Sequence, residues 1–336
     1  MQPNKYSSYN LNELPEGCKK CVLGEKLVLF ISGVCSRNCW YCSLSEKRKN
    51  KEVIYANEKL CENVQDVIQE AEESNATSAG ITGGDALVCL DKTIEYAQAL
   101  KSKFGKNFHI HIYLPTKLID KEKIEKLKPV IDEIRIHPEF LINPEKREFD
   151  IEKIKIVSEV IGKNNTGIEL PLLPDKKQEI KEFILQVKDI IGFVNLNQFE
   201  ISDTNFDKVT ENYELDDNGY TIKGSLEEGK RLLNELARER TKLKIHFCTA
   251  ELKLWHQYKN RLLRHKILPY GKRNEDGTVS YLAIYGEKIE GGYYDKKKDR
   301  TILSEKLARE LKGKHKVELV EEYPTSDGDE VERGEI

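Results

Sequence analysis

Along the first 250 residues, short apolar runs alternate with longer segments in which apolar positions recur every three or four residues. The short runs predict buried strands, and the longer segments predict amphipathic helices. The expected strands are 26–31, 77–81, 108–114, 133–136, 167–170 and 193–201, with 243–247 as one further candidate. The expected helices are 57–73, 91–104, 121–127, 151–161, 176–190 and 225–238.

This alternation indicates parallel βα units in a barrel or a doubly wound sheet, and therefore an α/β fold. We expect a partial (β/α)6 barrel of TIM-like form over residues 26–247. Right-handed crossovers bring the carboxyl ends of all its strands to one edge, where ligands bind in such folds. The loop 33–42, the Gly83-Gly84 turn and several strands that end at a proline lie at this edge.

The pattern changes after Cys248, where the regular alternation stops. A basic amphipathic helix is expected at 252–264, and Asn274-Glu275-Asp276-Gly277 is typical of a hairpin turn. The expected elements around and after that turn are strands near 267–270 and 279–285, a helix at 304–311 and a strand at 316–320. The acidic end, 321–336, is expected to fray. The chain therefore divides into an N-terminal arm (1–25), a barrel (26–247) and a small α+β extension (248–336).

The composition indicates a globular protein and argues against general attraction to nucleic acids or membranes. Hydrophobic residues make up 38% of the 336 positions, which suffices for a large core, and 55 basic against 58 acidic residues give a net charge of -3. This balance provides no global attraction to nucleic acid or membranes. No apolar run is long enough to span a bilayer, and the N-terminus lacks an apolar signal region, so we expect a cytoplasmic protein. Its 8 cysteines then require an explanation other than disulfides.

Three cysteines lie close together in the loop after the first strand, at Cys35, Cys39 and Cys42. Each of three thiolates at this spacing can bind one iron of a cubane cluster. Because no fourth cysteine is nearby, one iron would keep an open position, as a catalytic metal requires. The alternatives are a structural zinc knuckle and a ferredoxin-like electron carrier.

The Cys-x3-Cys-x2-Cys spacing, with the aromatic Tyr41 before the last cysteine, resembles the signature of the radical S-adenosylmethionine (SAM) superfamily. The resemblance implies a [4Fe–4S] cluster whose open iron chelates SAM, with Tyr41 near the adenine. It also implies reductive cleavage of SAM to methionine and a 5′-deoxyadenosyl radical, which abstracts hydrogen from a substrate. The electron would come from a donor of the flavodoxin or ferredoxin type.

The segment Ile81-Thr82-Gly83-Gly84-Asp85 resembles the Gly-Gly-Glu motif of the same superfamily, with Asp in place of Glu. Glycines allow close approach of the backbone to a ligand, and in the superfamily this backbone binds the SAM amino group. Further SAM contacts are implied at the ends of later strands. These candidates are Arg135, His137 and Glu169.

A second group of cysteines consists of Cys18 and Cys21, just before the first strand, and Cys248, just after the last one. A Cys-x2-Cys pair is half of a metal site. The set could hold a second iron–sulfur cluster or zinc, with His246 as a candidate fourth ligand, or remain plain thiols. Cys61, expected within a helix, and Cys89 fit the core, where free cysteine behaves as a small hydrophobe.

Residues 14–42 and the Phe247-Cys248 step resemble an archaeal group described as related to the pyruvate formate-lyase activating enzyme. The substrate stays open at this point. A basic stretch with interleaved aromatic residues, including Lys253, Arg261 and Arg264, suits RNA modification. Formation of a glycyl radical in a partner enzyme and a small-molecule biosynthetic step are the alternatives. An iron–sulfur or zinc binding module is the non-enzymatic alternative.

Overall fold

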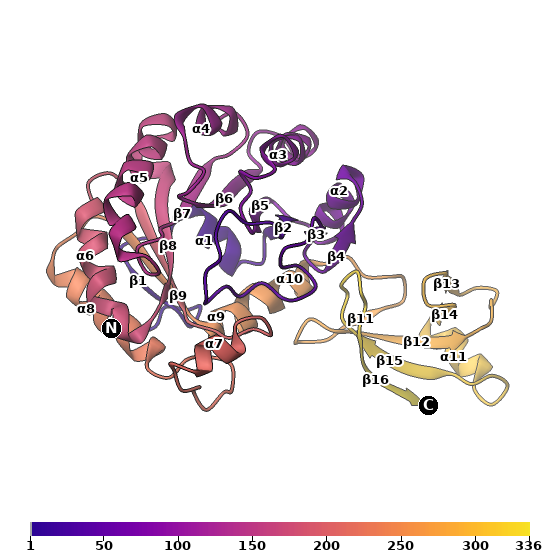
Figure 1. The fold of residues 1–336 in the computed structure, drawn as a ribbon. Coiled ribbons are helices and arrows are strands. Elements are labelled where there is room, and N and C mark those ends of the chain that lie inside the picture. Colours follow the sequence, from indigo (N-terminus) through magenta and orange to yellow (C-terminus); the bar gives the residue numbers. More distant parts are fainter. Residues whose placement is uncertain (1) are drawn as a thin grey trace.

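The computed structural model describes residues 2–336. Most of its first 265 residues surround a ten-stranded sheet in the order β1-β10-β9-β8-β7-β6-β5-β2-β3-β4. All neighbouring pairs from β2 to β10 along this order are parallel. The parallel strands are β2 (Lys26–Ser32), β5 (Ser78–Gly83), β6 (His109–Pro115), β7 (Glu133–His137), β8 (Thr166–Leu172), β9 (Phe193–Gln198) and β10 (Lys244–Cys248). The sheet curves into an open barrel (Figure 1).

Helices between the strands cover the outer face of this sheet (Figure 1). They are α2 (Val64–Glu73), α3 (Leu90–Phe104), α4 (Lys121–Leu127), α5 (Arg147–Ile161), α6 (Lys177–Val187) and α8 (Ser225–Arg238), with the short α7 (Phe206–Thr210) in the loop after β9. Each long helix buries one apolar face, as Phe183 and Ile184 of α6 illustrate. The expected partial (β/α)6 barrel is therefore confirmed, and the further candidate strand at 243–247 forms as β10.

The segment before α2 differs from the expected helix. It forms an antiparallel hairpin, β3 (Ile54–Ala56) and β4 (Lys59–Cys61), that extends the sheet beyond β2. Asn57 adopts a positive φ of 52° in the turn, which asparagine tolerates better than most residues. Asn63 and Asp66 then form a capping box that starts α2. Cys61 thus lies in a strand rather than a helix, although it is buried as expected.

The N-terminal segment is built into the barrel. Strand β1 (Tyr9–Leu11) pairs antiparallel with β10, with Tyr9 opposite Phe247. Helix α1 (Glu16–Val22) lies inside the open barrel (Figure 1), where the Gly17 amide donates to Glu133. A Cβ at Gly17 would lie 2.7 Å from Nδ1 of His111, so this approach requires glycine. Residues 1–25 are therefore part of the barrel and differ from the separate arm we expected.

After β10 the chain continues through α9 (Ala250–Leu252), the π-helical segment η4 (Lys253–Tyr258) and α10 (Lys259–Arg264). A second sheet then lies to one side of the barrel (Figure 1). It contains β11 (Lys272–Arg273), β12 (Val279–Tyr285), β13 (Tyr293–Asp295), β14 (Arg300–Leu303), β15 (Glu318–Glu322) and β16 (Glu330–Glu335), and α11 (Glu305–Leu311) packs against it.

Two features of this C-terminal part correct the sequence-based expectations. The hairpin forms around the expected turn, but its first strand is β11 at 272–273 rather than 267–270. The acidic end does not fray, because β16 pairs with β15. Buried beneath this sheet, Arg300 binds both carboxylate oxygens of Glu322, at 2.8 and 2.7 Å. Among the described residues, none of the helices has the length and apolarity needed to cross a bilayer.

Candidate active site

A cavity of about 610 Å³ opens at the carboxyl ends of the parallel strands. It collects residues that are far apart in the sequence. Of the expected site residues, those that line it are Cys18, Cys21, Cys35, Cys39, Tyr41, Cys42, Gly83, Gly84, Arg135, His137, Glu169 and Cys248. The structure thus brings every candidate except Asp85 to one cavity.

The loop after β2 places Cys35, Cys39 and Cys42 at the cavity wall, each as a free, partly buried thiol. The Cys42 amide donates to the Cys39 carbonyl at 3.1 Å, which turns the loop. Burial raises the pKa of Cys35 and of Cys39. Both thiols are therefore protonated at neutral pH until a metal displaces the proton, and loading the site releases protons.

The spacing of these three sulfurs fits a cluster better than a single ion. Among the described residues, only Glu70, Glu73 and His265 bring three metal-ligand atoms within 4.8 Å of one another. At least one pair of the three loop sulfurs is therefore more than 4.8 Å apart. Around one tetrahedral zinc with bonds of about 2.3 Å, thiolate sulfurs lie only about 3.8 Å apart. A cubane cluster separates its ligands further because each binds a different iron.

Hydrogen bonds from other elements hold the cysteine loop in place. Nη1 and Nη2 of Arg37 donate to the carbonyls of His137 (2.6 Å) and Pro138 (3.2 Å), at the end of β7. Asn205, next to α7, donates to the Tyr41 carbonyl at 3.1 Å. Neither side chain was among the site residues expected from the sequence. Arg37 could have been noticed as a charge within the cysteine loop, whereas nothing distinguishes Asn205 in its irregular segment.

Two glycines at the end of β5 let its backbone pass very close to this loop. Gly83 has a φ of 141°, and a Cβ there would lie 2.3 Å from the Ser32 carbonyl oxygen. A Cβ at Gly84 would lie 2.3 Å from the Val34 carbonyl oxygen and 3.0 Å from Cβ of Cys35. Any larger residue would therefore displace the cysteine loop.

Asp85 does not line the cavity, which corrects its expected contact with SAM. Its side chain is fully buried and accepts hydrogen bonds from Oγ of Ser36 at 2.6 Å and from the Leu87 amide at 3.0 Å. The shorter aspartate reaches the cysteine loop rather than the cavity. Asp85 is thus a positioning residue for Ser36, which adjoins Cys35.

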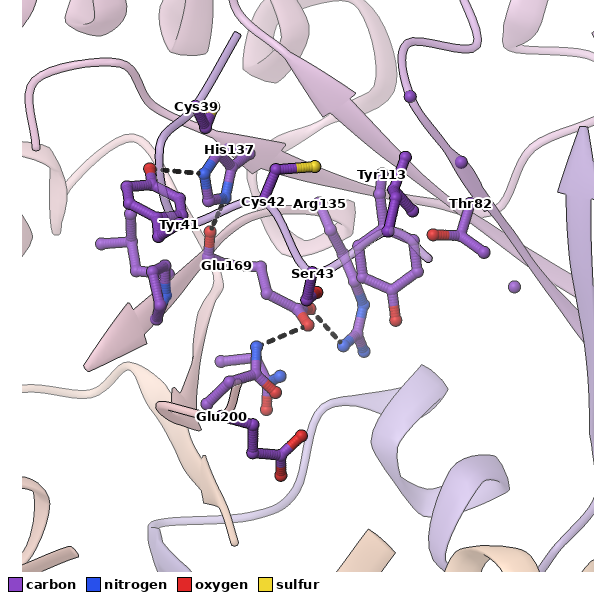
Figure 2. A pocket seen from close by; sticks show the side chains of 18 of the residues that line it. Cys39, Tyr41, Cys42, Ser43, Thr82, Tyr113, Arg135, His137, Glu169 and Glu200 are labelled. Atoms are coloured by element: carbon purple, nitrogen blue, oxygen red, sulfur yellow. Dashed lines mark hydrogen bonds and ion pairs between the residues drawn. The ribbon is translucent and has the colours of Figure 1, made fainter. Parts of the chain in front are cut away.

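Tyr41 and His137 lie together at the cavity wall (Figure 2). Oη of Tyr41 lies 2.9 Å from Nε2 of His137, and Nδ1 of His137 lies 2.9 Å from the Glu169 carbonyl oxygen. Burial and the charge of Arg37 lower the pKa of His137 to about 3. The imidazole is therefore neutral, and the Tyr41 side chain is fixed at the cavity wall.

Arg135 is held deeper in the barrel than a free ligand-binding arginine would be. Its guanidinium bonds to Glu133 (2.7 Å), to Glu169 (3.0 Å) and to Sγ of Cys18 (3.3 Å), and Figure 2 shows it beside the Glu169 carboxylate. Asn197 donates to the other oxygen of Glu169 at 2.9 Å. Arg135 therefore connects the cavity wall to the second group of cysteines.

Two lysines also reach the cavity, and the sequence analysis did not assign them to it. Lys26 opens β2 and lines the wall near Cys21 and Tyr113. Among the described residues it forms no salt bridge within 4.0 Å. Lys253, which we had grouped with a basic surface, lines the cavity and pairs with Glu200 at 2.9 Å. Lys253 begins the π-helical segment after β10, and the hydrophobic pattern of the sequence gives no sign of such a segment.

His246 is not available as a metal ligand, contrary to expectation. Its Nδ1 donates to Oδ1 of Asn195 at 2.8 Å, because an amide oxygen only accepts. Its Nε2 then accepts from Oγ of Ser8 at 3.0 Å. Both ring nitrogens are engaged, and burial lowers the pKa of His246 to about 3.

Comparison with known proteins identifies the family. The sequence profile of the radical SAM superfamily matches residues 29–185. A Methanocaldococcus jannaschii protein with the provisional name glycyl-radical enzyme activating enzyme is 37% identical over 286 residues, which cover 82% of this chain and 74% of that protein.

Two solved structures align at low identity. One, native anSMEcpe with bound AdoMet, is 13% identical with a TM-score of 0.43, over 76% of this chain and 73% of that chain. The other is the radical SAM methyltransferase TsrM from Kitasatospora setae, with tryptophan and a SAM analogue bound. It is 10% identical with a TM-score of 0.37, over 53% of this chain and 37% of that chain.

The profile match over the cysteine loop and the barrel from β2 to α6 agrees with the identity to the archaeal relative across most of the chain. The chain belongs to the radical SAM superfamily and is an enzyme that uses a [4Fe–4S] cluster and S-adenosylmethionine.

Proposed function

We propose that Cys35, Cys39 and Cys42 hold the [4Fe–4S] cluster and that the cavity beside them is the reaction chamber. The observation that carries this proposal is the convergence of three free thiols from one loop on a cavity walled by Gly83 and Gly84. When bound, the cluster supplies the electron that cleaves SAM to methionine and a 5′-deoxyadenosyl radical. This radical would then abstract a hydrogen atom from a substrate bound in the same cavity.

The protein's own groups would then bind and orient SAM. Gly83 and Gly84 expose backbone at the end of β5 close to Cys35, which suits the amino group of SAM. Tyr41, fixed by His137, offers an aromatic wall for the adenine. Glu169 presents its carboxylate at the cavity wall between Arg135 and Asn197, where it can accept from a hydroxyl group.

The direct test is anaerobic reconstitution with iron and sulfide, reduction with dithionite and measurement of 5′-deoxyadenosine after SAM is added. We expect product from the wild type and none from Cys39→Ala. Cys89→Ser is the matched control, because Cys89 lies outside the cavity-lining set and should leave product formation unchanged. Equal product from wild type and Cys39→Ala would contradict the assignment of this loop.

Activation of a partner enzyme is the second candidate function. It is supported by the name of the M. jannaschii relative, which describes a protein that acts on another protein. A reducing donor of the flavodoxin or ferredoxin type remains part of both proposals. Incubation with a glycyl-radical enzyme and SAM should produce the electron paramagnetic resonance doublet of a glycyl radical in the partner. Its absence while 5′-deoxyadenosine still forms would favour a small-molecule substrate.

The contacts of the basic stretch weigh against RNA. Arg261 binds Glu58 and Oδ1 of Asn57, and Arg264 donates to the Asn75 carbonyl. Lys253 is inside the cavity, paired with Glu200. Cations that are already paired within the protein contribute little to phosphate binding. We therefore propose a substrate other than RNA, and salt-resistant retention of RNA by the wild type would contradict this.

A further inference from the structure

Cys18, Cys21 and Cys248 come together in the same cavity, although two of them lie in α1 and the third at the end of β10. All three thiols are free, and Cys18 and Cys248 are only 3% and 6% exposed. The cysteines meet because α1 lies inside the barrel. This position of α1 requires Gly17, since a Cβ there would collide with His111, Arg135 and Glu133.

We infer that Cys18, Cys21 and Cys248 hold a second iron–sulfur cluster, one iron of which has no ligand from the protein and faces the reaction chamber. This inference rests on the proposed function in one respect, which is that the cavity is the reaction chamber. The three cysteines of the second cluster lie outside the loop 35–42, so they can bind iron whether or not that loop does.

The electrostatic surroundings fit an anionic cluster. Nη2 of Arg135 donates to Sγ of Cys18 at 3.3 Å, and the Cys18 thiol donates to Oδ1 of Asn195 at 3.5 Å. If a metal displaced the thiol proton, the contact with Arg135 would become a charge-assisted hydrogen bond. Lys26 lies near Cys21 and makes no ion pair in the described part of the chain, and Lys253 lies near Cys248. One buried cation, Arg135, and two partly exposed ones, Lys26 and Lys253, thus lie near the three sulfurs. A cubane core with three thiolates carries net negative charge. Lys26 is the cation that could balance it, because Arg135 is already paired with Glu133 and Glu169, and Lys253 with Glu200.

The separation of the sulfurs favours a cluster over zinc. The three thiols are not within 4.8 Å of one another, because in the described chain only the Glu70, Glu73 and His265 set meets that distance. One zinc would need its thiolates about 3.8 Å apart, given bonds of about 2.3 Å. Ligands to different irons of a cubane cluster are spaced more widely.

No fourth protein ligand is at hand. Both nitrogens of His246 are engaged. Among the carboxylates that line the cavity, Glu169 is held by Arg135 and Asn197, and Glu200 by Lys253. The cluster would therefore keep one iron open on the side of the chamber. A substrate with a nitrogen, oxygen or sulfur donor could bind there, close to where SAM is cleaved.

Two triple variants separate this inference from the proposed function. Replacing Cys35, Cys39 and Cys42 by Ala should leave about four irons per chain and abolish 5′-deoxyadenosine. Replacing Cys18, Cys21 and Cys248 by Ser should also leave about four irons, but with uncoupled SAM cleavage preserved. The wild type and the Cys89→Ser control should hold about eight.

The open iron is tested in the first triple variant, where only the second cluster is left. Cyanide, used as a probe, should shift the electron paramagnetic resonance signal of that reduced cluster. An unchanged signal would overturn the open position. Loss of all iron from this variant, or about one zinc per chain in its place, would overturn the second cluster itself. The proposed function would instead be overturned if the Cys35, Cys39 and Cys42 variant held as much iron as the wild type and both triple variants still cleaved SAM.

An independent observation points to a divalent ion between the barrel and the segment that leaves it. Glu70 and Glu73 of α2 and His265, just after α10, bring ligand atoms within 4.8 Å of one another. The side chains of Glu70 and His265 are only 1% and 7% exposed. Oε2 of Glu70 and Nε2 of His265 are nevertheless buried without a hydrogen-bond partner.

The surrounding hydrogen bonds prepare this set for a metal. Nδ1 of His265 donates to the Lys266 carbonyl at 2.9 Å, so Nε2 carries the free lone pair, as in metal-binding histidines. Asn57 donates to the other oxygen of Glu70 at 2.8 Å, and Gln69 donates to Glu73 at 2.7 Å. The geometry points to a zinc-type ion with one imidazole and two carboxylate ligands.

Cobalt(II) added to the iron-loaded protein tests this site, because the six cysteines of the cavity are then occupied. We expect about one cobalt per chain, with visible d–d absorption and no thiolate charge-transfer band. His265→Gln should lose it. His315→Gln should retain it, since His315 faces only Glu287 on the surface. Equal cobalt binding by His265→Gln and wild type, or none by wild type, would overturn the site.

Discussion

Oη of Tyr41 donates its hydrogen bond to Nε2 of His137, and the direction of this bond is fixed by a third group. Nδ1 of His137 faces the Glu169 carbonyl oxygen, which can only accept, so the proton of the neutral imidazole lies on Nδ1. Nε2 must then accept from Tyr41. The aromatic residue of the cysteine loop is therefore anchored through β7 to β8.

Replacing Tyr41 by Phe removes this donor and leaves a buried lone pair on His137. An unsatisfied buried group costs about 1–3 kcal/mol, so we expect a lower melting temperature and slower formation of 5′-deoxyadenosine. Tyr220→Phe is the control, because Tyr220 is 41% exposed. Equal melting temperatures for both variants would show that the bond contributes nothing to stability.

The neutral His137 should make stability depend on pH. Its pKa is about 3 in the folded protein, against about 6.5 in the unfolded chain. The unfolded chain therefore binds the extra proton between these values, and stability is lost as pH falls from about 6.5 towards 3. The loss is about 1.4 kcal/mol per pH unit, measurable by urea unfolding of the iron-free protein at several pH values.

In this experiment, His137→Asn is the comparison, since asparagine does not titrate. Its free energy of unfolding should fall less steeply with acidification than that of the wild type. Identical slopes would mean that His137 is not held neutral.

Gly84→Ala tests the close approach of β5 to the cysteine loop. The added methyl would meet the Val34 carbonyl and Cβ of Cys35, so the loop must shift, and we expect less bound iron and loss of SAM cleavage. Gly334→Ala is the control, because a Cβ at Gly334 meets nothing within 4 Å. Full iron content in Gly84→Ala would show that the loop can accommodate the displacement.

Asp85 and Ser36 should act as a unit. Asp85→Ala removes the acceptor of the partly buried Ser36 hydroxyl and should lower the free energy of unfolding by about 1 kcal/mol. Ser36→Ala should weaken the loop in the same way, and the double variant should cost less than the sum of the two. Chemical unfolding of all three variants measures this coupling. Strict additivity would mean that the 2.6 Å bond does not hold the loop.

Arg300 should be essential to the C-terminal sheet and dispensable for the barrel. Arg300→Ala leaves the buried Asp295 without its cation and Glu322 with Lys298 alone, at a cost of about 3 kcal/mol. We expect selective proteolysis beyond residue 265 while SAM cleavage persists. Arg309→Ala, whose side chain is 81% exposed, should behave as wild type. Loss of the barrel together with the sheet would contradict independent folding of the two parts.

The barrel was predictable because its strands and helices each have a clear hydrophobic period. The hairpin before α2 was not, since the 57–63 segment carries apolar residues at spacings that also suit a helix. There the positive φ of Asn57 and the cap at Asn63 decide the outcome. Similarly, β16 has almost no apolar residues, and only its pairing with β15 orders it.

Residues of the cavity that lie in recognisable motifs were predictable, such as Cys35 and Gly83. Others were not, because their roles depend on tertiary contacts between distant segments. Asp85 turns towards Ser36, and His246 is satisfied by Asn195 and Ser8. Arg37 donates to carbonyls about 100 positions away. Local sequence carries no information about such partners.

The pairing of Tyr9 with Phe247 also determines when the barrel can be completed during synthesis. A nascent chain on the ribosome has its first strand long before the partner strand emerges. Strand β1 and the cysteines of α1 must therefore wait, unpaired, until about 240 more residues have been translated. Any metal delivered earlier would meet an incomplete set at Cys18, Cys21 and Cys248, so we expect loading of that set to follow the emergence of β10.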